Sequence, residues 1–505
     1  MLKRIFALLL VVVLVALAVA AYYLRDPNQF KQDLQDLAAE QSGYKVTING
    51  DIHWRWALPF GVSAEDIAAT ADNETITVDR LTLGISFGSV FAAFDDWRIN
   101  TLHLQDVYWE DSESIIRVSD FHLQDFRTGA SSPFAMQLGY EGTDPDPIIV
   151  TADIAGRLNY GDNELLRFTD AKVSSSLAVG TCQGAVNEAQ RATGPRQERP
   201  EDLLPLNDLL DYDLTLSCDL ADIPDLPVPL APASLKIANQ QGNTHIQLST
   251  NNFWAGALTL ETQIDLAAQP LRWTVKTDAA GIDSAEFVDW AKVKQNWQAK
   301  LDIDSTLTLR GNSEDELLSS IAGTANLDGG TGSIDISALR SVLNAAALIS
   351  GKENPVKGWP EELGYQEFTA QWRAQGKASE VEFTLDNIQG EASGAVDFVE
   401  QTMDVHGWLR VYEPTNRVGL RLPEELMNTK LPMNCQGLLV EPKCRPDKSG
   451  LVNLLRRTLT GEKAETLRNT VEKTIEEKVP DKLKDSLRGL LAVSYTHLTL
   501  PTIRE

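Results

Sequence analysis

Two histidines in a repeated pattern are the residues whose types and spacing could most readily do chemistry. The segments INTLHLQDV (residues 99–107) and VSDFHLQDF (residues 118–126) share His-Leu-Gln-Asp at the same offset. Imidazoles with carboxylates can bind metals or transfer protons, so His103 and His122 could be two half-sites. Each histidine alternates with apolar neighbours, however, and alternate residues of a strand point to opposite faces. We interpret both as solvent-side strand histidines and expect no metal site, because a shared site would need a strand register that sequence does not give.

A second pattern, GISFG (residues 84–88), matches G-x-S-x-G with Ser86 in the nucleophile position. That motif works on a strained turn between a strand and a helix. Here Leu83, Ile85 and Phe87 continue a strand alternation through the motif, so Ser86 is predicted to lie on the polar face. Phosphate-loop and zinc-protease motifs are absent as well. We therefore expect no catalytic residue, no cofactor and no enzymatic activity.

A repeated apolar unit organises the region that contains these histidines. Apolar residues alternate, and the alternation then slips by one residue at polar pairs, namely Asp79-Arg80, Asn100-Thr101, Gln105-Asp106, Ser119-Asp120 and Gln124-Asp125. A one-residue slip moves side chains to the other face unless a bulge restores them. Because the unit recurs at spacings near twenty residues, we interpret it as a strand pair with its turn.

The same alternation returns along most of the chain, which predicts a mainly β fold of twenty or more short strands in antiparallel meanders. Helical patterns are short. One follows Asp26-Pro27, with Phe30, Leu34, Leu37 and Ala38 on one face and Gly43 as its end. Another starts at a capping box from Ser313 to Glu316 and continues to Ile321. A charged amphipathic helix is expected in residues 446–492.

The N-terminus predicts export of the chain. Residues 5–24 carry no charge and are long enough to span a bilayer, and Lys3 and Arg4 precede them. We expect an uncleaved transmembrane anchor with the bulk of the chain outside the cytoplasm. A cleaved signal peptide is the alternative, since Ala18-Val19-Ala20 fits a cleavage site.

The four cysteines, Cys182, Cys218, Cys435 and Cys444, are an even number in an exported chain, which suggests disulfides. We expect sequence neighbours to pair, with Cys182–Cys218 closing the base of a polar excursion (residues 187–205). Free buried thiols are the alternative. The net charge of −27 argues against a nucleic-acid partner.

Beyond these patterns, the order of several motifs resembles the AsmA family. The segment DPNQFKQDLQDLAAEQSGYKVTINGDIHWRW after an apolar N-terminus is similar to that family's opening, and ITVDRLTLGISFGSVF is similar to its next hairpins. GNSEDELLSSIAGTANLDGGTGSIDISALRSVL resembles its C-terminal signature. The resemblance covers most of residues 1–490 and is weakest at 176–260.

The resemblance implies an inner-membrane anchor followed by an elongated, taco-shaped antiparallel β-groove in the periplasm. It implies phospholipid binding and conduction, with a role in outer-membrane biogenesis and integrity. Phospholipids, the inner membrane and other envelope proteins are the implied partners. The candidate groove-lining residues are Ile76, Val78, Leu81, Leu83, Ile85, Ile99, Leu102, Leu104, Phe121 and Leu123. The alternative function is an assembly factor for outer-membrane proteins that does not transport lipid.

The expected organisation follows from these boundaries. Residues 1–25 form the anchor, 26–175 an N-terminal helix and β-repeats, 176–220 a variable excursion and 221–445 the C-terminal part of the groove. Residues 446–492 form the amphipathic helical end. The last segment, residues 493–505, breaks the helical pattern abruptly and resembles translated sequencing adapter, so it is left out of fold reasoning.

Overall fold

The computed structural model describes residues 26–447, with gaps at 57–59, 72–73, 86–97, 111–113, 143–148, 162–165, 190–202, 205, 225, 227, 293–295, 338–339, 341–360, 415–419, 421 and 423–426. The chain divides into two compact units, residues 1–253 with 258–271, and residues 254–257 with 272–505. The expected anchor, Ser86, most of the 187–205 excursion, nearly all of the 446–492 helix and the 493–505 tail lie outside the described residues. Among the described helices, none combines the length and apolar character that crossing a bilayer requires.

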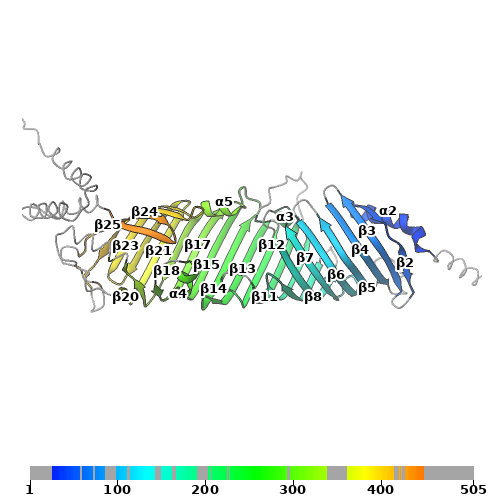
Figure 1. Cartoon of the computed structure of the whole chain (residues 1–505), viewed down its shortest axis with the longest axis horizontal. Helices are drawn as coiled ribbons and strands as arrows, with labels where there is room; N and C mark the ends of the chain where they lie inside the picture. The colour runs from blue at the N-terminus through cyan, green and yellow to red at the C-terminus, as the bar shows by residue number, and fades with distance from the viewer. Residues whose placement is uncertain are drawn as a thin grey trace, which may run out of the picture. The chain divides into compact units, whose positions relative to one another are not determined.

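The first unit opens with a short 3-10 helix, η1 (Pro27–Phe30), followed by α2 (Lys31–Ser42). Asp26 caps the start, because its Oδ1 accepts a hydrogen bond of 2.9 Å from the backbone N–H of Asn28. Gly43 ends the helix in a left-handed conformation with φ of 76°. Both ends agree with the sequence-based prediction. In α2 and η1 (blue in Figure 1), Phe30, Leu34 and Leu37 are exposed to solvent.

The first unit is otherwise a ladder of antiparallel strands in which β3 to β13 pair in sequence order, while β1 and β2 both pair with β3. Their bounds are β1 (Lys45–Ile48), β2 (Ile52–Arg55), β3 (Gly61–Ala71), β4 (Glu74–Ile85), β5 (Ile99–Glu110), β6 (Ser114–Phe126), β7 (Ser132–Gly142), β8 (Ile149–Tyr160), β9 (Leu166–Ser175), β10 (Val179–Glu188), β11 (Tyr212–Asp222), β12 (Ala233–Gln240) and β13 (Asn243–Phe253), with α3 (Leu206–Asp211) before β11. β14 (Gly256–Asp265) follows.

The second unit repeats this architecture, with β15, β17, β18 and β21 to β26 paired antiparallel in that order. Their bounds are β15 (Arg272–Asp283), β17 (Lys300–Arg310), β18 (Ala322–Asp328), β21 (Phe368–Gln375), β22 (Ala378–Leu385), β23 (Ile388–Asp397), β24 (Thr402–Val411), β25 (Leu431–Leu438) and β26 (Glu441–Pro446), with helices α4 (Ser284–Trp290) and α5 (Glu314–Ser319). A separate small sheet contains β16 (Trp297–Gln298), β19 (Gly332–Asp335) and β20 (Glu362–Tyr365).

The small sheet packs against one end of the second ladder, and the two sheets enclose a hydrophobic core between them. Buried residues from both sheets pack together there, among them Ile336, Tyr365, Leu385, Leu409 and Val411. The Nε1–H of Trp297 donates a hydrogen bond of 2.8 Å to the hydroxyl of Tyr365, and this bond satisfies the polar end of a side chain that is only 1% exposed. The apolar side chains at this end of the second unit are therefore shielded from solvent.

Two details of the sequence-based prediction are wrong. The repeated apolar unit is one long strand and not a strand pair, since β4, β5 and β6 each contain a whole unit in 12 or 13 residues. Irregular residues inside a strand look like a turn when only spacing is read. The helix after Ser313 is also shorter than predicted: α5 ends at Ser319, and Ile321 lies beyond it, just before β18.

Candidate functional site

The candidate site is the apolar face of the first ladder, and β7 shows how its side chains come to lie together. β7 pairs with β8 without any irregularity, so Phe134, Met136, Leu138 and Tyr140 alternate regularly and share one face. Their partners on β6 are Leu123, Phe121, Val118 and Ile116. Direct cross-strand partners lie on the same face, so the β6 residues share that face despite the slip between Val118 and Phe121.

The register extends this face from β7 back to β3 as four rows that run across the strands. The rows are Val62–Leu83–Leu102–Leu123–Phe134, Ala64–Leu81–Leu104–Phe121–Met136, Ile67–Val78–Val107–Val118–Leu138 and Ala69–Ile76–Trp109–Ile116–Tyr140. Ile85 and Ile99 pair with each other beside the first row. The structure thus brings all the candidate residues of the sequence-based prediction onto one face. Figure 1 shows the strands that carry them, β3 to β7, side by side.

Extra residues in the strands keep the rows aligned. Between the second and third rows the pairing skips Asp66 on β3, Asp79 on β4, Asp106 on β5 and Ser119 on β6. Asp66 and Asp106 adopt positive φ angles of 50° and 48°. A bulge of this kind absorbs one residue and restores the alternation. Skipped residues occur at every polar pair at which the sequence pattern slips.

Most of the apolar face is only partly covered. Of the candidate residues, Leu123 is buried at 6% exposure, and the others are half-buried. In the described part of the chain, η1 and α2 lie against β1 and β2, and α3 lies against β11. β4 to β9 contact mainly their ladder neighbours. The middle of this face therefore presents aliphatic and aromatic carbon that no described helix covers.

The same face continues from β8 to β13. One row runs Leu158–Phe168–Gly184–Leu216–Ile237–Ile246, and another runs Ala171–Cys182–Cys218–Leu235–Leu248. A Cβ on Gly184 would meet the Phe168 ring at 2.7 Å, so the glycine makes room for that ring. The apolar rows thus extend across the whole series β3 to β13.

Two disulfides join neighbouring strands. Cys182 and Cys218, which are direct partners on β10 and β11, are bonded at 2.12 Å, and Cys435 and Cys444 on β25 and β26 are bonded at 2.02 Å. The first bond joins the two strands that flank the polar excursion. Structural disulfides form in oxidising compartments, which indicates an extracytoplasmic location for the chain.

The opposite face of the first ladder is polar, and it contains the histidines of the repeated pattern. His103 and His122 are direct partners on β5 and β6, and the next row on that face is Arg80–Gln105–Asp120–Gln137. The two histidines are exposed at 23% and 43% of their side chains. They do lie on the polar face, as predicted, but they are adjacent to one another. Only the register, which the sequence does not give, reveals this contact.

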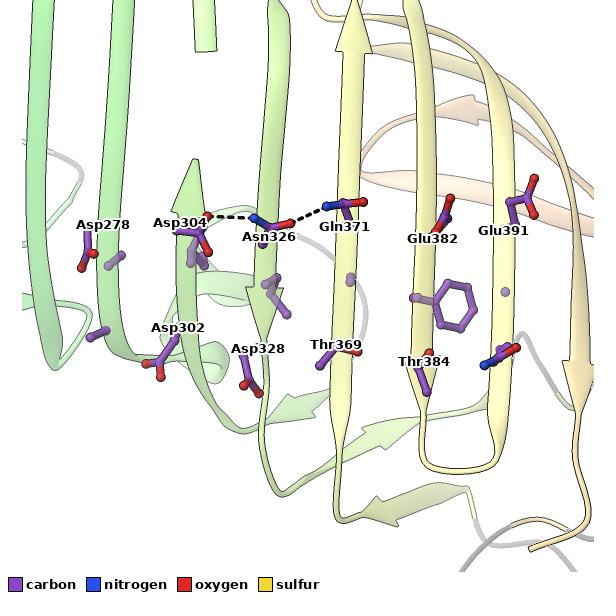
Figure 2. Close-up of a pocket in the computed structure, with 18 of the residues that line it drawn as sticks. Asp278, Asp302, Asp304, Asn326, Asp328, Thr369, Gln371, Glu382, Thr384 and Glu391 are labelled. Atoms are coloured by element: carbon purple, nitrogen blue, oxygen red, sulfur yellow. Dashed lines mark hydrogen bonds between the residues drawn. The ribbon is translucent and has the colours of Figure 1, made fainter. Parts of the chain in front are cut away.

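The second unit has a separate polar pocket of about 740 Å³ on its ladder. Figure 2 shows its labelled side chains in two rows across the strands. The register defines these rows as Asp278–Asp304–Asn326–Gln371–Glu382–Glu391 and Asp302–Asp328–Thr369–Thr384. The sequence analysis did not identify this pocket, because its members come from strands far apart in the chain.

Hydrogen bonds link the pocket's first row across three strands. The Nδ2–H of Asn326 donates to Asp304 at 2.8 Å, and the Nε2–H of Gln371 donates to the Oδ1 of Asn326 at 2.9 Å (Figure 2). Arg373 beside the pocket donates to Glu382 and Glu380, and these hydrogen bonds raise the pKa of its guanidinium. The pocket has six lining carboxylates and no lining lysine or arginine, so its lining is strongly acidic.

The fold and this face define a class of protein. Its antiparallel strands form an open ladder with one apolar face, and its disulfides indicate an oxidising compartment. A sequence model of the AsmA family matches residues 2–92 and 170–353, together more than half of the chain. The chain therefore belongs to the AsmA family. Searches of curated proteins and of solved structures found no match.

Proposed function

We propose that this protein binds phospholipid acyl chains on the apolar face of β3 to β13 and conducts them along the rows. The observation that carries the proposal is the continuity of that face. Half-buried apolar side chains line up across consecutive strands, while the reverse face is polar. A sheet that exposes such a face needs an apolar partner, and acyl chains supply one.

The energetics fit a conduit better than a tight receptor. Burying one methylene contributes about 0.8 kcal/mol, so a sixteen-carbon chain could contribute about 12 kcal/mol as an upper bound. Successive rows present nearly the same side-chain types to the lipid. Neighbouring positions are then close in free energy, and a lipid can move from one to the next without a deep trap.

The proposed setting is the periplasm of a two-membrane envelope, with the chain anchored in the inner membrane by residues 5–24. The disulfides and the uncharged N-terminal segment support this placement. AsmA membership supports a role in outer-membrane biogenesis and integrity, with phospholipids as cargo and other envelope proteins as partners. In this proposal the protein moves a hydrophobic molecule without chemical change and is not an enzyme.

The test is site-specific photocrosslinking in cells whose phospholipids carry radioactive phosphate. A benzophenone amino acid replaces Leu104 in one variant and Gln105 in another, both in the full chain. These neighbours lie on opposite faces of β5, with Leu104 on the apolar face and Gln105 on the polar face. We expect labelled phospholipid to be captured at position 104 and little to be captured at position 105.

Charge substitution gives an independent readout. Leu104→Asp places a carboxylate in the second apolar row, and it should abolish the lipid that co-purifies with the folded protein. The control, Gln105→Asp, adds the same charge on the other face and should leave that lipid in place. Equal lipid capture at both positions, or capture of outer-membrane proteins at position 104 without lipid, would overturn the proposal and favour an assembly factor.

A further inference from the structure

The polar face of β5 and β6 holds a compact group of two imidazoles and one carboxylate. The Nε2 of His103 lies 2.6 Å from Oδ1 of Asp120, and the Nε2 of His122 lies 3.0 Å from Oδ2 of the same residue. The two imidazole rings stack with 3.8 Å between their centroids and 17° between their planes. One carboxylate therefore bridges two parallel rings.

We propose that His103, Asp120 and His122 form a binding site for a divalent transition metal, with Zn²⁺ as the reference ion. Each residue can offer one ligand atom, and these atoms lie within 4.8 Å of one another. Zinc binds imidazole nitrogen and carboxylate oxygen at about 2.0 to 2.2 Å, so ligand atoms around one ion are a few ångströms apart. The three present ligand atoms lie within such a distance of one another.

The backbone pre-organises this donor set. His103 and His122 are direct cross-strand partners, and Asp120 is two residues from His122 on the same face of β6. Two strands of a long ladder thus fix three side chains, and little ordering of the backbone is needed when an ion binds. A partly exposed carboxylate, at 38% of its side chain, leaves room for water as a further ligand.

The donor chemistry selects the class of metal. Two imidazole nitrogens and one carboxylate suit Zn²⁺, Co²⁺, Ni²⁺ and Cu²⁺, with affinity highest for Cu²⁺. Calcium and magnesium prefer sites made of oxygen ligands and are disfavoured here. The site lies on the polar face, opposite the rows proposed to hold lipid, so the inference does not depend on lipid binding.

The experiment uses the full chain in detergent, without a polyhistidine tag and freed of metal by a chelator. Titration with ZnCl₂ is followed by calorimetry, and titration with CoCl₂ by visible absorption of the nitrogen-ligated ion. We expect about one strong site per chain, and we expect excess chelator to reverse the binding.

Variants assign the site. His122→Gln and the nearly isosteric Asp120→Asn should each weaken Zn²⁺ binding by at least about tenfold, the usual effect of removing part of a metal's ligand shell. His406→Gln is the matched control, because His406 also lies near an aspartate, with its Nε2 3.9 Å from Oδ1 of Asp404, but has no second imidazole in the group.

Circular dichroism shows whether each variant keeps its strands, and Asp120→Asn preserves side-chain volume if His122→Gln does not fold. The proposal is overturned if the parent chain binds no Zn²⁺ or Co²⁺. It is also overturned if folded Asp120→Asn and His122→Gln bind Zn²⁺ as tightly as the His406→Gln control does.

Discussion

Individual aspartates shape the first ladder. Asp66, Asp106, Asp125 and Asp170 have φ angles of 50°, 48°, 50° and 49°, and each interrupts a strand. Asp visits the left-handed region more readily than most residues, because its short polar side chain can bond locally. The slips at polar pairs were predictable from sequence. Which member of a pair would take positive φ was not, because that choice depends on how the two neighbouring strands pair.

Substitutions at Asp106 should separate conformation from side-chain chemistry. Glycine adopts positive φ without strain, so Asp106→Gly should leave the free energy of unfolding nearly unchanged. Asp106→Val forces a β-branched residue into the left-handed region and should cost about 1 to 2 kcal/mol. Urea unfolding followed by circular dichroism measures both.

Asp79 provides the control for this prediction. It is skipped in the same pairing on β4 but is not among the residues with positive φ. Asp79→Val should therefore cost less than Asp106→Val. Equal losses at the two positions would show that backbone conformation is not what Asp106 contributes.

At the scale of elements, the stability of helix α4 depends on its N-cap residue, Asp283. Asp283 accepts hydrogen bonds from the backbone N–H groups of Ala285 at 3.0 Å and Glu286 at 3.4 Å, and it pairs with Lys300 at 3.1 Å. Burial acts to raise the pKa of this carboxyl, but the hydrogen bonds from Lys300 and the backbone outweigh burial and hold the pKa below its usual range.

This lowered pKa predicts a pH dependence with a definite sign. The Asp283 carboxylate stabilises the fold above the unfolded-state pKa of about 3.9, and the contribution is lost as pH falls through the lower folded-state pKa. Asp283→Ala should cost about 1 kcal/mol at neutral pH, and the difference from the parent should shrink at acidic pH, where the carboxylate is protonated. Thermal unfolding at the two pH values measures it.

Asp289→Ala is the matched control for Asp283→Ala, since Asp289 is an exposed residue of the same helix. It should change the unfolding temperature little at either pH. If Asp283→Ala destabilised the protein equally at neutral and acidic pH, the carboxylate's charge would not be responsible.

The elements also show where sequence reasoning succeeds. The caps at Asp26, Gly43 and Ser313 are local, and each was predictable from residues within one turn of the helix. Strand length was misjudged because a bulge and a turn have similar residue types. The contact between His103 and His122, and the pocket around Asp304, depend on register across strands, which no local pattern encodes.

For the whole molecule, the net charge of −27 argues against recognition of lipid through attraction to anionic headgroups. Attraction to anionic headgroups would weaken as salt screens it, over a Debye length of about 10 Å at 0.1 M. Binding through an apolar face has no such dependence. We therefore expect the amount of zwitterionic phospholipid bound by the full chain to change little between low and high salt.

The measurement compares uptake of zwitterionic and anionic phospholipid, with the same acyl chains, over a range of NaCl concentrations. The zwitterionic lipid should be bound equally throughout, and the anionic lipid should gain with salt as repulsion is screened. A steep loss of either lipid at high salt would indicate headgroup recognition by basic side chains and would contradict binding through the apolar rows.

A ladder in which each strand touches little besides its two neighbours has a consequence for how such chains can change in evolution. Adding or removing one hairpin preserves the direction of every remaining strand, and the apolar rows join again across the seam. Adding or removing a single strand would reverse the direction of everything that follows. The length of such a sheet can therefore vary in steps of two strands, and each step adds about 10 Å.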